Sequence, residues 1–197
     1  MNFKRLGPAF VVAAALMAFA GVGTASATTL TGVGGAVLKT GTTLHVVSSG
    51  TNTMTTSFLN IQCTSSKAAG KTSNETGTAI MIEVTERTTE GCNCEVKVLK
   101  TGTLAITWTS GNNGTVSSSG AEITANCSSI FGNVHCIYAT NNTDMGTLVG
   151  SATTGATATL NTSADIPRLS TSALCAEKGT WDAAYKVDNP DTLNVKN

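Results

Sequence analysis

Apolar and polar residues alternate along most of this chain with the two-residue period of a β-strand. The alternation is clearest at 78–85, where Ile80, Ile82 and Val84 would face a core and the residues between them would face solvent. No later segment shows the period of an amphipathic helix, and turn residues separate the alternating runs. The pattern therefore predicts an all-β protein of about ten short strands.

The segment 120–140 predicts a hairpin, and we expect the other strands to be arranged around it. On the outgoing strand the side chains of Ile123, Ala125 and Cys127 share one face. The return strand carries a second cysteine, Cys136, on its own apolar face. The hairpin would therefore hold one cysteine on each side of its turn.

The rest of the chain reads as further short strands joined by polar turns. Strands are predicted at 28–39, 42–47, 53–63, 94–99, 103–109, 146–152, 156–162, 180–187 and 192–195. Loops or turns are predicted at 64–76, 87–93, 111–114 and 165–170. Such a series without a fixed repeat favours a sandwich or a barrel. Of the two we expect a single antiparallel β-sandwich, Ig-like or jelly-roll-like, stapled by disulfides.

The first 27 residues have the pattern of a secretory signal peptide. Lys4 and Arg5 precede an apolar run at 8–20, and small residues at 25–27 fit a cleavage site. The apolar run is shorter than the ~20 residues that a membrane-spanning helix needs. We therefore expect residues 1–27 to be removed on export.

Residues 28–197 are then expected to form one all-β domain with no membrane span, secreted or loosely associated with the cell surface. The whole chain has 12 lysines and arginines and 12 acidic residues; the leader contains Lys4 and Arg5, which leaves 10 against 12. The basic residues are scattered, so no surface is expected for nucleic acid or anionic membrane.

Six cysteines follow the leader, and an even number in an exported chain suggests three disulfides. The hairpin suggests one set of pairs, which is Cys127–Cys136, Cys63–Cys92 and Cys94–Cys175. A second set also fits, which is Cys63–Cys92, Cys94–Cys127 and Cys136–Cys175. The Cys-Asn-Cys motif at 92–94 has no matching second motif, so we expect neither a metal site nor a cofactor.

Candidate chemistry is sparse. The chain has only two histidines, His45 and His135, and no GxSxG motif that would position a serine for a catalytic triad. Few aromatic residues are available for ligand contacts, and the candidates are Trp108, Trp181 and Tyr185. These three are also expected core residues. We therefore expect a protein that is not an enzyme.

Several short motifs in the second half of the chain recur together. They are Cys136-Ile137-Tyr138, 144–148, 156–160, Ile166-Pro167-Arg168, Leu174-Cys175, Trp181, Tyr185 and Leu193-Asn194-Val195. With them the chain resembles a set of uncharacterised secreted bacterial β-rich proteins. It is more distantly similar to the protein activator of alkane oxidation family. The resemblance implies a bacterial extracellular protein, transfers no catalytic residue, and favours the pairing of Cys94 with Cys127.

These observations lead to two hypotheses about function. The first is a non-enzymatic structural or interaction role in the envelope or extracellular matrix, with self-association or binding of other envelope proteins through strand edges such as 28–38 or 192–195. The second is an extracellular binding module for a hydrophobic ligand or a glycan.

Overall fold

The computed structural model describes residues 27–129, 132–151, 153 and 155–197, so the predicted leader lies outside the described residues except for Ala27. The described residues form strands and one 3-10 turn, η1 (Val33–Gly35), without an α-helix. The strands are β1 (Thr28–Thr31), β2 (Thr43–Ser48), β3 (Asn52–Thr55), β4 (Asn60–Cys63), β5 (Ser65–Thr72), β6 (Thr76–Gly77), β7 (Ile80–Glu90), β8 (Glu95–Lys100), β9 (Thr103–Ser110), β10 (Asn113–Ser119), β11 (Glu122–Ser129), β12 (Gly132–Ala139), β13 (Thr143–Val149), β14 (Thr159–Pro167), β15 (Lys178–Asn189) and β16 (Asn194–Lys196). The all-β prediction is confirmed. No helix within these ranges has the length and apolar content to cross a membrane.

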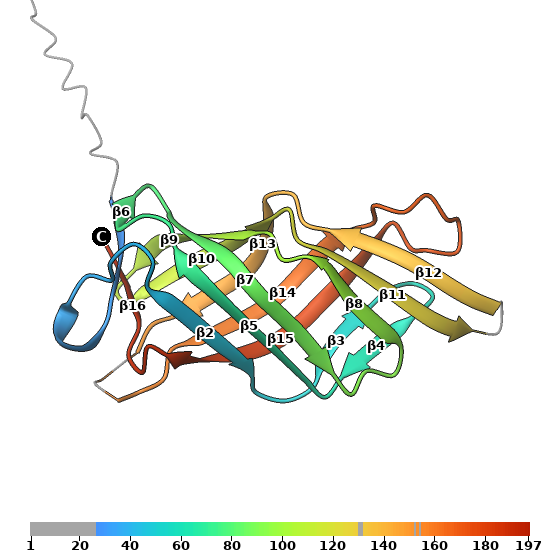
Figure 1. The fold of residues 1–197 in the computed structure, drawn as a ribbon, viewed down its shortest axis with the longest axis horizontal. Helices are drawn as coiled ribbons and strands as arrows, with labels where there is room; N and C mark the ends of the chain where they lie inside the picture. The colour runs from blue at the N-terminus through green and yellow to red at the C-terminus, as the bar shows by residue number, and fades with distance from the viewer. Residues whose placement is uncertain (1–26, 130–131, 152, 154) are drawn as a thin grey trace, which may run out of the picture.

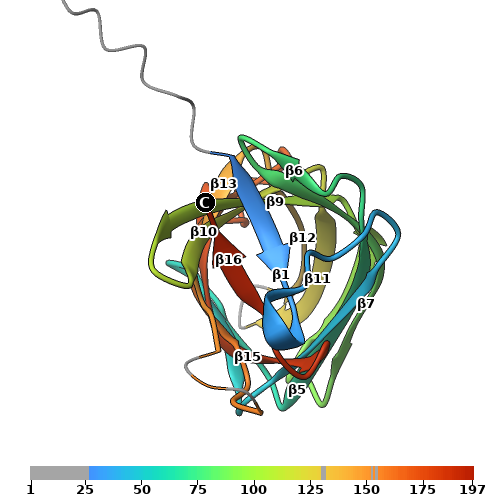
Figure 2. The same ribbon diagram turned by 90° about the vertical axis from the view of Figure 1, so that its left-hand side faces the viewer.

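Eight of these strands close into an antiparallel barrel (Figures 1 and 2). In order around the barrel they are β2, β5, β7, β9, β10, β13, β14 and β15, and β15 pairs again with β2. Neighbours in the barrel are thus successive barrel strands in the sequence. Of the remaining strands, β1 precedes the first barrel strand, β16 follows the last, and the others are insertions between barrel strands. The predicted single β-sandwich is wrong, because the sheet returns to its own first strand.

Alternation could not separate the two architectures, since both give strands with one buried and one exposed face. The difference lies in pairings between segments far apart in the chain. β15 pairs with β14 along its length and with β2 through Tyr185 to Asn189, which joins the two ends of the series. The alternation of apolar and polar residues does not predict this pairing of distant strands.

A small sheet of β16, β1 and β6 lies across one end of the barrel, and Figure 2 looks onto it. Leu30 of β1 and Val195 of β16 are buried there, so this sheet caps the barrel. The cap uses the two segments predicted to offer strand edges. β1 is paired on both sides, by β16 and by β6.

The other end of the barrel is prolonged by an extension made of β3 and β4 and of a sheet of β8, β11 and β12 (Figure 1). The predicted hairpin is confirmed as β11 and β12, with Ile123 and Cys127 buried on one face. It is not the centre of the fold, however, because it belongs to the extension.

The disulfides follow the second set of pairs: Cys63–Cys92, Cys94–Cys127 and Cys136–Cys175. The set based on Cys127–Cys136 is wrong, because the hairpin register places Cys127 opposite Val134 and Cys136 opposite Ala125. None of the six cysteines lies on a barrel strand. The disulfides therefore hold the extension together. The barrel is closed by hydrogen bonds between strands, without a disulfide between barrel strands.

Three segments predicted as loops or turns contain barrel strands. β5 occupies most of 64–76, β7 continues to Glu90, and β14 continues to Pro167. The hydrophobic pattern does not predict β5, because the inward positions of this strand carry the small residues Ser66, Ala68 and Gly70 rather than large apolar ones. Gly70 is needed there, since a Cβ atom would lie 2.7 Å from the Cγ2 atom of Ile82.

We expect that replacing Cys94 and Cys127 together with serine will lower the free energy of unfolding without opening the barrel. The disulfide closes a loop with a sequence separation of 33. Its loss should therefore cost about 3.5 kcal/mol in a urea titration. Hydrogen exchange of β9 and β10 should stay slow in the native variant. Loss of protection throughout the barrel would contradict this division of roles.

Candidate functional site

The barrel is hollow. Two adjoining cavities of about 60 and 70 Å³ lie inside it. The two are adjacent, because six residues line both of them: Val46, Ala68, Val84, Leu104, Val116 and Leu160. We call the first the apolar cavity and the second the mixed cavity.

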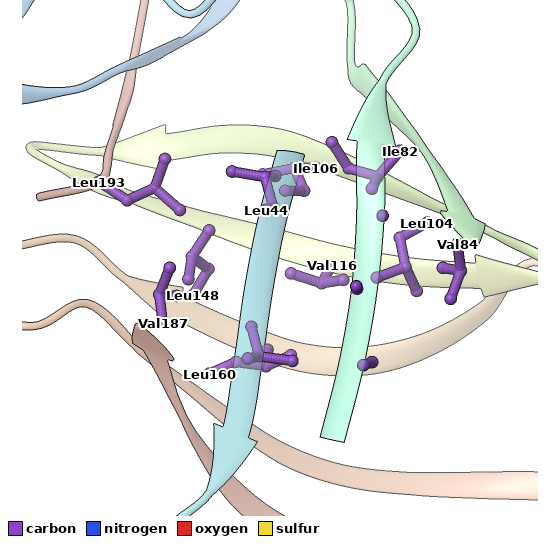
Figure 3. Close-up of a pocket in the computed structure, with 14 residues that line it drawn as sticks. Leu44, Ile82, Val84, Leu104, Ile106, Val116, Leu148, Leu160, Val187 and Leu193 are labelled. Atoms are coloured by element: carbon purple, nitrogen blue, oxygen red, sulfur yellow. The ribbon is translucent and has the colours of Figure 1, made fainter. Parts of the chain in front are cut away.

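The apolar cavity is lined only by aliphatic residues, alanine and glycine within the described chain. Figure 3 shows leucine, isoleucine and valine side chains from several barrel strands pointing into it. Leu193, which precedes the capping strand β16, also lines this cavity. Apolar cavities of this kind stay free of water and admit small apolar molecules.

The mixed cavity lies next to it, and its other residues are Ser66, Lys67, Arg87, Thr101, Ser118, Met145, Thr162, Trp181 and Tyr185. All the polar side chains that line the two cavities are therefore in this one. The barrel interior is thus apolar at one side and polar at the other.

β5 explains why the interior is not filled. Its inward side chains at Ser66, Ala68 and Gly70 are small, whereas the neighbouring strands contribute branched aliphatic residues such as Val46 and Val84. An eight-stranded barrel is just wide enough to be filled by side chains or to hold one small ligand. Small residues along one strand leave part of this barrel interior unfilled by side chains.

A hydrogen-bond network fixes the aromatic wall of the mixed cavity. The Ser66 hydroxyl donates to the Tyr185 hydroxyl oxygen at 3.0 Å, and the Trp181 Nε1 atom donates to the same oxygen at 3.3 Å. The Asn52 side-chain amide in turn donates to Ser66 at 3.0 Å. All four side chains are buried, so the network holds this wall in one geometry.

The wall also contains a buried hydroxyl that has no hydrogen-bond partner among the described residues. The Thr162 hydroxyl is buried, with 6% of the residue exposed, and finds no hydrogen bond among the described residues. Buried hydroxyls are normally satisfied by protein, water or a ligand. Thr162 therefore leaves one hydrogen-bonding position open in the mixed cavity.

Arg87 brings a positive charge to the same wall. Its side chain is half-buried, and the guanidinium carbon lies 5.8 Å from the centroid of the Trp181 ring. Arg87 falls in the segment predicted to be a turn, but β7 continues through it as a barrel strand. The strand period of Ile80, Ile82 and Val84 shifts by one residue before Arg87, because β7 contains an irregularity there.

Of the three aromatic residues proposed as ligand contacts, two line a cavity and one does not. Trp181 and Tyr185 line the mixed cavity. Trp108 lines neither cavity, and its Nε1 atom donates to the backbone oxygen of Gly111 at 3.2 Å. The polar residues of the wall, Arg87 and Thr162, were not predicted as site residues.

The two histidines lie away from the cavities. The Nδ1 atom of His45 is 2.5 Å from a carboxylate oxygen of Asp188, outside the barrel. His135 lies in the extension and hydrogen-bonds Asn126, which donates to Glu95. No serine hydroxyl bonds either imidazole in the part of the chain that is described.

The charges of the extension interact with each other rather than with the barrel interior. The hydrogen bond from Lys97 lowers the pKa of Glu95, and the bond from Asn126 adds to this effect. In the described ranges no three His, Cys, Asp or Glu side chains are arranged to hold a metal ion. The barrel interior is therefore the stronger candidate site.

Comparison with known proteins adds no further assignment. No protein-family model matches the chain, and neither a curated protein nor a solved structure matches it. The resemblance to secreted bacterial proteins and to the alkane oxidation activators therefore stays a prediction. The residues that line the cavities are therefore the basis for a proposed function.

We expect Tyr185→Phe to lower the free energy of unfolding by about 1–2 kcal/mol, because Ser66 and the Trp181 N–H lose their shared partner. Tyr138→Phe is the matched control. The Tyr138 hydroxyl is buried without a partner among the described residues, and burial raises the pKa of that hydroxyl. Chemical denaturation should show a clear loss for Tyr185→Phe and almost none for Tyr138→Phe. Equal losses would argue against the network.

Proposed function

We propose that this protein binds a small hydrophobic molecule inside its barrel, outside the cell, and that it is not an enzyme. One observation carries the proposal: the closed barrel encloses a cavity with an entirely apolar end. Ligand sites are typically concave and apolar with a few polar groups that fix orientation. The two cavities have this composition.

The size of the space sets the size of the ligand. The cavities measure about 60 and 70 Å³, and an engineered apolar cavity of about 150 Å³ admits benzene. We therefore propose a ligand with a short chain or a single ring. The inward residues Val46, Leu104 and Leu160 are only partly buried, so a ligand would cover apolar surface that the fold itself leaves uncovered.

Two further features support this function. None of the described residues that line the cavities is a histidine, cysteine, aspartate or glutamate, so the serine, lysine and tyrosine of the mixed cavity have no imidazole or carboxylate beside them in its lining to act as a general base. The three disulfides are consistent with an extracellular location. The hypothesis of a structural role through self-association stays a prediction, and no feature of the barrel favours it over binding.

Binding of straight-chain alcohols tests the proposal directly. In a Trp108→Phe variant Trp181 is the remaining tryptophan, and it lies in the wall of the mixed cavity. Its fluorescence should change saturably as an alcohol is added. Affinity should rise about fourfold with each added CH₂ group until the cavity is full, because each group leaves water. A linear, non-saturating response for every alcohol would exclude the proposal.

A pair of alanine variants locates the binding. Ala68 points into the barrel from β5, whereas Ala184 lies exposed on the outside of β15. Ala68→Leu should fill the cavity and abolish the saturable signal, while Ala184→Leu should bind like the unaltered protein. Thermal unfolding would show that both variants are folded. Normal alcohol binding by Ala68→Leu would place the ligand elsewhere.

A further inference from the structure

The position of Arg87 suggests the chemistry of the ligand. Arg87 pairs in register with Ala68 of β5, and Ala68 pairs with Val46 of β2. Directly opposed residues point to the same side of a sheet. Arg87 therefore projects toward the barrel interior with these two cavity residues, and it too lines the mixed cavity.

The charge of Arg87 is not balanced within the described residues. It makes no ion pair and no hydrogen bond there, and its one recorded contact is the face of Trp181. The acidic residues of the same strand, Glu83, Glu86 and Glu90, are exposed. The other charged residue lining the mixed cavity is Lys67, which is also positive.

A half-buried guanidinium without an acidic partner is unfavourable because it loses hydration without gaining a counter-charge. An anion would supply the missing partner, and guanidinium binds planar carboxylates through two parallel hydrogen bonds. Arg87 is half-buried and lines the mixed cavity, so a ligand in that cavity can contact its guanidinium group.

Resting on the binding function proposed above, we infer that the ligand is a small amphiphilic carboxylate. Its carboxylate pairs with Arg87, and its hydrocarbon part extends into the apolar cavity. The apolar cavity contains no polar side chain within the described chain, so it accepts the tail and not the head.

Two hydroxyls in the same wall can assist the carboxylate. The Thr162 hydroxyl has no partner in the described structure and is free to donate. The Tyr185 oxygen accepts hydrogen bonds from Ser66 and Trp181, so its own proton remains available to the cavity. The polar groups of the mixed cavity thus offer donors and no carboxylate, which is the complement of an anionic head group.

The test compares pentanoate with 1-pentanol, which share a short chain that suits the size of the cavities and differ in charge. Both are titrated below their aggregation limits into the oxidised protein, residues 28–197, by isothermal titration calorimetry. The proteins are the unaltered chain, Arg87→Met, Arg87→Lys and Lys186→Met. Lys186 is an exposed residue of β15, so its variant removes one positive charge outside the barrel.

The unaltered protein should bind pentanoate more tightly than pentanol. Arg87→Met should weaken pentanoate binding about tenfold or more, the usual loss when a charged hydrogen bond is removed. Saturable pentanol binding should persist and weaken less than pentanoate binding, which also shows that the variant is folded. Arg87→Lys should keep part of the preference for pentanoate, and Lys186→Met all of it.

The failures of the two proposals are distinct. If pentanol binds saturably but pentanoate gains nothing, or if Arg87→Met leaves the preference unchanged, the carboxylate inference is wrong and the hydrophobic site stands. If neither compound binds the unaltered protein, the binding function itself is wrong. Equal weakening of pentanoate binding by Lys186→Met and Arg87→Met would also overturn the inference, since it would reflect net charge alone.

Discussion

The pairing of β15 with both β14 and β2 is the constraint on which this structure depends. It turns a series of antiparallel strands into a closed barrel and so removes the two free edges that an open sheet would have. It also defines an inside. Tyr185 and Val187, which lie where β15 meets β2, both point into that interior.

Small residues rather than large ones determine how much of the barrel interior is left unfilled. Ser66, Ala68 and Gly70 leave space that their neighbours do not fill. The polar groups are then confined to one side, where Arg87 and Tyr185 lie. The same chain thus supplies a hydrogen-bonded wall, an apolar space and a positively charged group beside it.

The sequence predicted local structure well and long-range structure poorly. The alternation of Ile80, Ile82 and Val84 correctly predicted the first part of β7, because burial of one face of a strand is visible in its residues. Closure left no such trace. The candidate site was found only in part for a related reason: aromatic residues such as Trp181 stand out in a sequence, whereas Ala68 and Arg87 gain their meaning from register across strands.

Closure also has a consequence for the time course of folding. His45 and Asp188, which meet where β2 pairs with β15, are 143 residues apart in the chain. Contacts between such distant segments form slowly, since the intervening chain must be ordered first. Until β15 arrives, β2 is an unpaired edge that can join another chain. β15 is the last barrel strand to be synthesised. Its pairing with β2 therefore ends the period in which aggregation through this edge is most favoured.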